Sequence, residues 1–151
     1  MYPFEARFVR AGLLYLLFTA VTGTLFYVFP GLIRPLVSVH THAGIVGFFL
    51  NLVMGVAFWM MPRPNQLRQD RLEAWAFWLL NVGLAARVLF EPPLIAWRWP
   101  LQVVLVLSAA LQTAGIAVFV AGMTQRVLTS ADLRRLRAAR DARAGETPDG
   151  R

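Results

Sequence analysis

The sequence predicts an all-α membrane protein, an antiparallel bundle of four transmembrane helices with both termini in the cytoplasm. Two features of its composition and patterning predict this class. Hydrophobic residues make up 58% of the 151 residues and charged residues only 15%, whereas soluble domains carry about 25% charged residues. Four apolar stretches also reach the roughly 20 residues that a helix needs to cross a bilayer. The distribution of arginine then sets the orientation.

The four predicted spans are bounded by residues that end helices. Pro30-Gly31 follows the first span, Pro62 follows the second, and Pro92-Pro93 follows the third. The loops are short, so consecutive helices should pack as antiparallel neighbours. The transmembrane domain is therefore expected over 1–128, with spans at 8–29, 37–61, 72–90 and 100–128.

Arginine supplies all 15 basic residues, and its distribution is strongly asymmetric. Only Arg34 and Arg98 fall on one side of the predicted spans. Most others fall on the opposite side, namely arginines 7, 10, 63, 68, 71, 126, 134, 135, 137, 140, 143 and 151. The positive-inside rule places that side, with both termini, in the cytoplasm. We therefore expect a multi-pass protein of the inner membrane of a bacterium, with tryptophans near the span ends forming interfacial belts.

The segment 129–151 is expected to be a basic cytoplasmic tail. Ser130-Ala131-Asp132 is typical of a helix start, and the Gly-, Pro- and acid-rich residues 144–151 are expected to be disordered. The net charge of +7 does not indicate nucleic acid, because the arginines flank spans and suit anionic lipid. The absence of cysteine excludes disulfides and thiolate metal sites.

Two histidines, His40 and His42, lie near the outer end of the second span. Ionisable residues inside a membrane are costly and mark candidate functional sites. In a regular helix, residues two apart differ by about 200° around the axis. The two side chains should therefore point in opposite directions, which disfavours a simple copper or zinc chelate.

Small residues follow His40 on the same side of a regular helix. Gly44, Gly47, Asn51 and Gly55 all fall within about 60° of His40. Such a face lets another helix approach closely, and it equally offers room for a flat macrocycle. Helix packing explains the glycines alone, whereas the two histidines at one level favour a ligand role.

Arg87 lies in the third span at the expected depth of the histidines. It can pair with Glu91 on the same helix face, or it can hold an anion such as a heme propionate. Arg34, just before the second span, can also hold an anion. Other intramembrane residues are expected to make interhelical bonds (Asn81, Gln112 and Thr113) or to lie in the core (Met54 and Met123).

The segment 40–48, His-Thr-His-Ala-Gly-Ile-Val-Gly-Phe, resembles the second transmembrane helix of the catalytic subunit of heme–copper oxidases. It is most similar to the C-class oxidases and nitric oxide reductases, in which an Arg-Pro-Leu-His-Thr-Asn-Ala-type motif supplies a ligand of heme b. His40-Thr41 and Ala43 match that motif. Arg34-Pro35-Leu36 is present but is separated from His40, and His42 replaces asparagine. Short four-span relatives of that subunit also look similar.

The resemblance implies heme b, with His40 as the first candidate axial ligand and His42 as the second. A complete oxidase subunit has many more spans and further histidines, so this chain is not expected to be an oxidase or reductase alone. A second histidine ligand would have to come from another chain, most simply in a C₂ homodimer. The expected roles are electron transfer, heme handling, or sensing of nitric oxide or oxygen.

Two other functions stay open. The chain can be a cofactor-free accessory or assembly subunit that packs by its glycine stripes and contacts a partner, such as a respiratory oxidase or nitric oxide reductase, through its basic tail. It can also be a copper-handling protein that uses His40 and His42 at the outer face. A colourless protein would favour the first, and bound metal without a porphyrin spectrum would favour the second.

Overall fold

The computed structural model describes residues 3–61, 66–92, 98–124, 126–127, 132, 134–135 and 137–140, without the side chains of 66–69 and 98–100. These parts are almost entirely helical. The expected disorder of 144–151 and the interfacial positions expected for Trp97 and for the side chain of Trp99 fall outside what is described.

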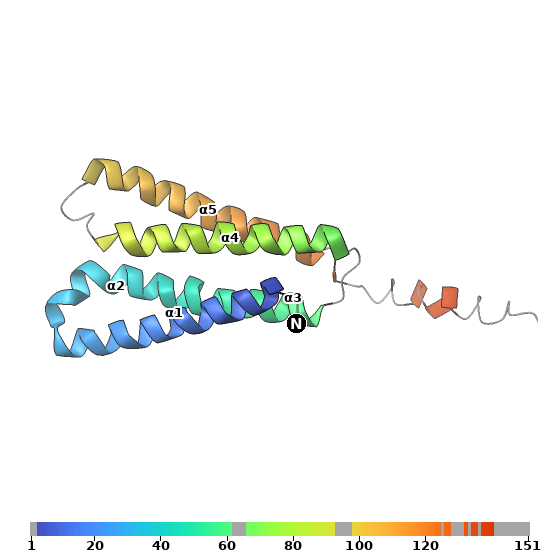
Figure 1. The fold of residues 1–151 in the computed structure, drawn as a ribbon, viewed down its shortest axis with the longest axis horizontal. Coiled ribbons are helices and arrows are strands. Elements are labelled where there is room, and N and C mark those ends of the chain that lie inside the picture. Colours follow the sequence, from blue (N-terminus) through green and yellow to red (C-terminus); the bar gives the residue numbers. More distant parts are fainter. Residues whose placement is uncertain are drawn as a thin grey trace, which may run out of the picture.

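Four long helical segments make up the fold (Figure 1). The first is α1, and the second is a continuous run of a short 3₁₀ turn (η1), α2, a π-helical segment (η2) and α3. Helices α4 and α5 complete the set. Their bounds are α1 Pro3–Val28, η1 Pro30–Leu32, α2 Ile33–His42, η2 Ala43–Leu50, α3 Asn51–Met60, α4 Gln66–Phe90 and α5 Arg98–Thr124.

Among the described residues, the prediction of four helices long and apolar enough to span a membrane is confirmed. The stretches Pro3–Val28, Pro30–Met60, Asp70–Phe90 and Leu101–Thr124 are long and apolar enough to cross a bilayer. Many large apolar side chains on these helices are exposed. In water this would be costly, whereas in a bilayer such side chains face lipid.

The helix ends differ from the predicted ones because proline is tolerated in the first turn of a helix. Only Phe29 separates α1 from the helical run that begins at Pro30, although the predicted spans leave residues 30–36 between them as a loop. Similarly, α5 begins at Arg98, ahead of Pro100. The first helix begins at Pro3 instead of residue 8, and the last ends at Thr124 instead of 128.

The π-helical segment Ala43–Leu50 is the main departure from regular geometry. Asn51 stabilises its end, since the side-chain Nδ2 donates to the carbonyls of Val46 at 3.2 Å and Gly47 at 2.9 Å. A π-helix has more residues per turn than an α-helix. A helical wheel at 100° per residue therefore loses its phase beyond His42.

The helices pack in two side-by-side pairs, α1 with the second span and α4 with α5 (Figure 1). Glycine allows the close approach of α4 and α5, because a Cβ on Gly83 would lie 2.8 Å from the carbonyl oxygen of Ser108. Aromatic side chains join the pairs, with the Phe8 ring centroid 5.1 Å from that of Phe77. This core also contains Met54, as predicted.

Candidate functional site

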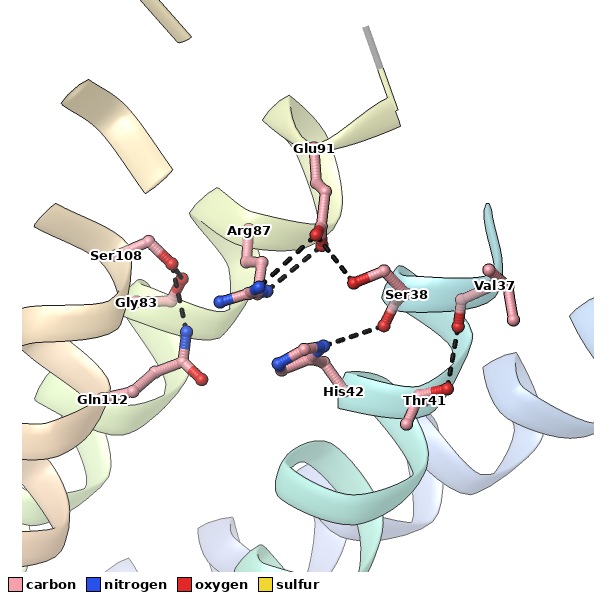
Figure 2. Close-up of polar contacts among 9 residues, drawn as sticks. All are labelled: Val37, Ser38, Thr41, His42, Gly83, Arg87, Glu91, Ser108 and Gln112. Atoms are coloured by element: carbon pink, nitrogen blue, oxygen red, sulfur yellow. Dashed lines mark hydrogen bonds and ion pairs between the residues drawn. The ribbon is translucent and has the colours of Figure 1, made fainter. Parts of the chain in front are cut away.

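A cluster of polar side chains joins α2 to α4 near the start of α2 and the end of α4 (Figure 2). The Nε of Arg87 lies 3.1 Å from Glu91 Oε2, and its Nη2 lies 3.4 Å from Glu91 Oε1. The predicted Arg87–Glu91 pair is therefore confirmed. The hydroxyl of Ser38 donates to Glu91 Oε1 at 2.7 Å. Glu91 thus links the second span to α4 and orients the guanidinium of Arg87.

The imidazole of His42 lies beside this cluster. Its Nδ1 is 2.8 Å from the carbonyl oxygen of Ser38, and a carbonyl can only accept, so Nδ1 carries the proton of this hydrogen bond. In the neutral ring Nε2 is then left with its lone pair. Figure 2 shows the ring projecting from α2 towards the side of α4 that carries Arg87.

Arg87 keeps a donor that Glu91 does not use. Nε and Nη2 both contact the carboxylate, whereas Nη1 has no partner among the residues that the structure describes. In Figure 2 this nitrogen points away from Glu91. The pair therefore leaves Arg87 able to donate to an anion.

His40 is held in a different environment, against α1. Its Nδ1 is 2.8 Å from the Oγ1 of Thr22, and its ring centroid lies 5.2 Å from that of Phe26. The hydroxyl of Thr22 donates its one proton to the Phe18 carbonyl at 2.9 Å, so it accepts here from Nδ1 of His40. The two histidines consequently point to different neighbours, as the helical wheel predicts.

The small-residue face beside His40 is filled by α1. A Cβ on Gly47 would lie 2.5 Å from Tyr15 Cγ, one on Gly55 would lie 2.9 Å from Phe8 Cβ, and one on Gly44 would lie 3.4 Å from Thr19 Cγ2. These glycines serve helix packing, and no room for a macrocycle is left between them and α1.

Asn51 lies on this face beside Gly12 of α1, and its amide reaches α4. Its Oδ1 accepts a hydrogen bond from the Nδ2 of Asn81 at 2.9 Å, which confirms the interhelical bond predicted for Asn81. Gln112 instead donates to Ser108 on its own helix, and Ser108 donates to the carbonyl of Gly83 on α4 (Figure 2). Thr113 bonds only within its own helix.

Arg34 lies apart from the histidine cluster. It is exposed near the start of α2, and no hydrogen bond or ion pair joins it to another residue in the described ranges. A role in anion binding therefore has less structural support for Arg34 than for Arg87.

A second charged cluster, at the opposite end of α4, is absent from the sequence-based expectations. Arg126, counted above among the loop arginines, is buried, and its Nη2 lies 2.6 Å from Glu73 Oε1. Its Nη1 donates to the carbonyl of Phe58 at 2.8 Å, in the last turn of α3. Glu5 and Glu73 are also buried. The signal in the sequence is an acidic residue near the same end of two spans, together with an arginine after the last one.

Within the described ranges, no three His, Cys, Asp or Glu side chains gather as a metal-binding group. Comparison of the chain with protein-family models, with curated proteins and with solved structures finds no match. The function must therefore be inferred from the geometry and chemistry of this chain's own residues.

Proposed function

We propose that this protein binds heme b in the membrane, with Nε2 of His42 as an axial ligand of the iron. The observation that carries the proposal is the hydrogen bond from His42 Nδ1 to the Ser38 carbonyl. Metal-ligating histidines usually donate their other ring nitrogen to a carbonyl or carboxylate, which fixes the tautomer and the ring direction. His40 lies on the face that α1 occupies, whereas His42 lies beside Arg87 (Figure 2), so the order of the two candidates is reversed from the sequence-based one.

Arg87 supports the same site. Two nitrogens of Arg87 contact the carboxylate of Glu91, and the remaining Nη1 can donate to a heme propionate. Ser38 holds Glu91 from the second span, so ligand and anion donor are fixed by one set of hydrogen bonds. When bound, heme supplies reversible one-electron chemistry at its iron. The chain's own residues ligate, orient and exclude water.

One chain has a single His42 and therefore provides one such ligand. The face beside His40 is occupied by α1. We infer that a six-coordinate iron takes the same histidine from a second copy in a C₂ homodimer. The helices form an antiparallel bundle with cytoplasmic termini in a bacterial inner membrane, which puts His42 near the outer surface. Electron transfer, heme handling or gas sensing would suit this position.

Titration of the detergent-purified full chain with hemin tests the assignment. Wild type and His40→Ala should develop the sharp visible spectrum of a six-coordinate b-type heme, and His42→Ala should not. Added imidazole should restore part of the spectrum to His42→Ala. Thr41→Ala is the matched control, because this exposed hydroxyl bonds only to the Val37 carbonyl one turn away.

Either of two results would contradict the proposal. If the wild-type protein does not take up hemin, the proposal that it binds heme is wrong. Loss of the spectrum in His40→Ala but not in His42→Ala would keep the heme and overturn the assignment of its ligand.

The glycines need no cofactor to explain them, which suits one other function, a cofactor-free accessory or assembly subunit of a respiratory complex, although they pack within this chain and not against a partner. Gly47, Gly55, Gly83 and Gly115 all lie where a Cβ would meet a neighbouring helix within 3 Å. They can therefore be explained by helix packing alone. This function predicts a colourless protein that tolerates both histidine substitutions.

A further inference from the structure

A groove between α1 and α4 lies apart from both histidines. Its volume is about 550 Å³, and its walls carry aromatic side chains, among them Tyr15, Phe18, Phe77 and Trp78. Trp78 is 53% exposed at the rim. Since both helices are candidate membrane spans, the groove opens towards lipid, and a ligand would enter it from the bilayer.

One wall of the groove carries a polar group without a partner. Asn81 lines the groove, and its Oδ1 is buried without a hydrogen-bond partner among the described residues. The amide cannot be turned to remove this defect, because its Nδ2 donates to Asn51 Oδ1 at 2.9 Å and to the Phe77 carbonyl at 3.0 Å. Both of these partners are acceptors. A buried acceptor left unpaired is costly and calls for an explanation.

The opposite wall offers a second polar atom. Tyr15 on α1 lines the same groove, and its hydroxyl makes no hydrogen bond to any residue in the described ranges. Asn81 from α4 and Tyr15 from α1 thus supply the amide and the hydroxyl of a lining otherwise made of rings and aliphatic side chains. Few polar groups in a mostly apolar pocket are typical of small-molecule sites.

We propose that this groove binds a lipid-soluble aromatic alcohol, a phenol or hydroquinone with an apolar tail, whose hydroxyl donates to Asn81 Oδ1. The aromatic walls suit a flat ring. A lipid acyl chain could fill the same volume, but it has no donor for Asn81. This inference does not depend on heme, because it concerns different residues on different helix faces.

Binding of nonylphenol and of its methyl ether tests the proposal. The two molecules have the same ring and tail, but only the phenol can donate. Binding to the full chain in lipid nanodiscs is read from the dose-dependent rise in the thermal unfolding midpoint. Nonylphenol should bind about five- to tenfold more tightly than the ether, the factor expected for one neutral hydrogen bond.

Two variants distinguish the loss of the hydrogen-bond acceptor from the loss of the space inside the groove. Asn81→Leu removes the acceptor and should bring the affinities for the phenol and the ether to the same value. Ala85→Phe fills the groove, leaves the Asn51–Asn81 bond in place and should abolish binding of both. Ala110→Phe, on an exposed position of α5, is the control and should bind like the wild type.

Equal affinity for the phenol and its ether in the wild type would overturn the proposal, as would unchanged binding in Ala85→Phe. A shift of Ala85→Phe from dimer to monomer, without phenol binding by the wild type, would assign the groove to a second copy of the chain instead.

Discussion

The close packing of α1 on the second span gives a sharp prediction at Gly47. A Cβ at this position would lie 2.5 Å from Tyr15 Cγ and 2.8 Å from Tyr15 Cβ. A change of rotamer moves Tyr15 Cγ but not Tyr15 Cβ, which is fixed to the backbone, so α1 itself must move. Overpacking of this kind costs about 1–3 kcal/mol, with larger values in rigid sites.

Gly44 is the matched control on the same face. There a Cβ would meet Thr19 Cγ2 at 3.4 Å, an ordinary van der Waals contact. Alanine is favoured over glycine inside a helix by about 1 kcal/mol. This gain applies to both variants, so Gly44→Ala should be neutral or stabilising. The free energies of unfolding of Gly47→Ala and Gly44→Ala should differ by roughly 1–3 kcal/mol, with Gly47→Ala the less stable.

Unfolding in mixed micelles of a mild detergent and sodium dodecyl sulfate measures this difference. Equal stability of the two variants would refute the packing of α1 on the glycine face. Hemin titration of the same samples adds a second check. If Gly47→Ala lost hemin uptake while keeping wild-type stability, heme would bind against the glycine face.

Three further predictions follow from the buried polar contacts and the arginine distribution. Glu73→Gln and Arg126→Met should each lower the free energy of unfolding by about 3–5 kcal/mol, because each breaks a buried ion pair; a double variant no worse than either single one would support the ion pair, and additive losses would contradict it. A double-mutant cycle of Asn51→Leu and Asn81→Leu in the same unfolding assay should give a coupling energy of about 0.6–1.7 kcal/mol, the range for hydrogen bonds between membrane helices, and zero coupling would deny their bond. The chain has no cysteine, so Arg34→Cys in intact cells should react with a membrane-impermeant maleimide, whereas labelling only after lysis would reverse the topology.

Much of the fold follows from the sequence because span length and hydropathy are summed over many residues. Four spans are predicted, and the described part of the chain holds four helices long and apolar enough to cross a membrane. The ends are less predictable, since a proline can end one helix or begin the next. Pro30 shows this, because it starts the second helical run and the sequence predicts a break there.

The candidate site is less predictable because it depends on local geometry and on contacts distant in sequence. The Arg87–Glu91 pair is foreseen because its members are four residues apart on one helix. The link to Ser38 and the burial of Arg126 are not, since their partners lie on other helices. The π-helical segment Ala43–Leu50 is not foreseen either, because a regular wheel assumes about 100° per residue throughout.

The most direct test of the central claim is a reduced-minus-oxidised visible spectrum of the protein purified from its own membranes. Our account predicts the sharp bands of a six-coordinate b-type heme in the wild type and their absence in His42→Ala. A wild-type protein that is colourless, and that stays colourless after heme is added, would contradict it.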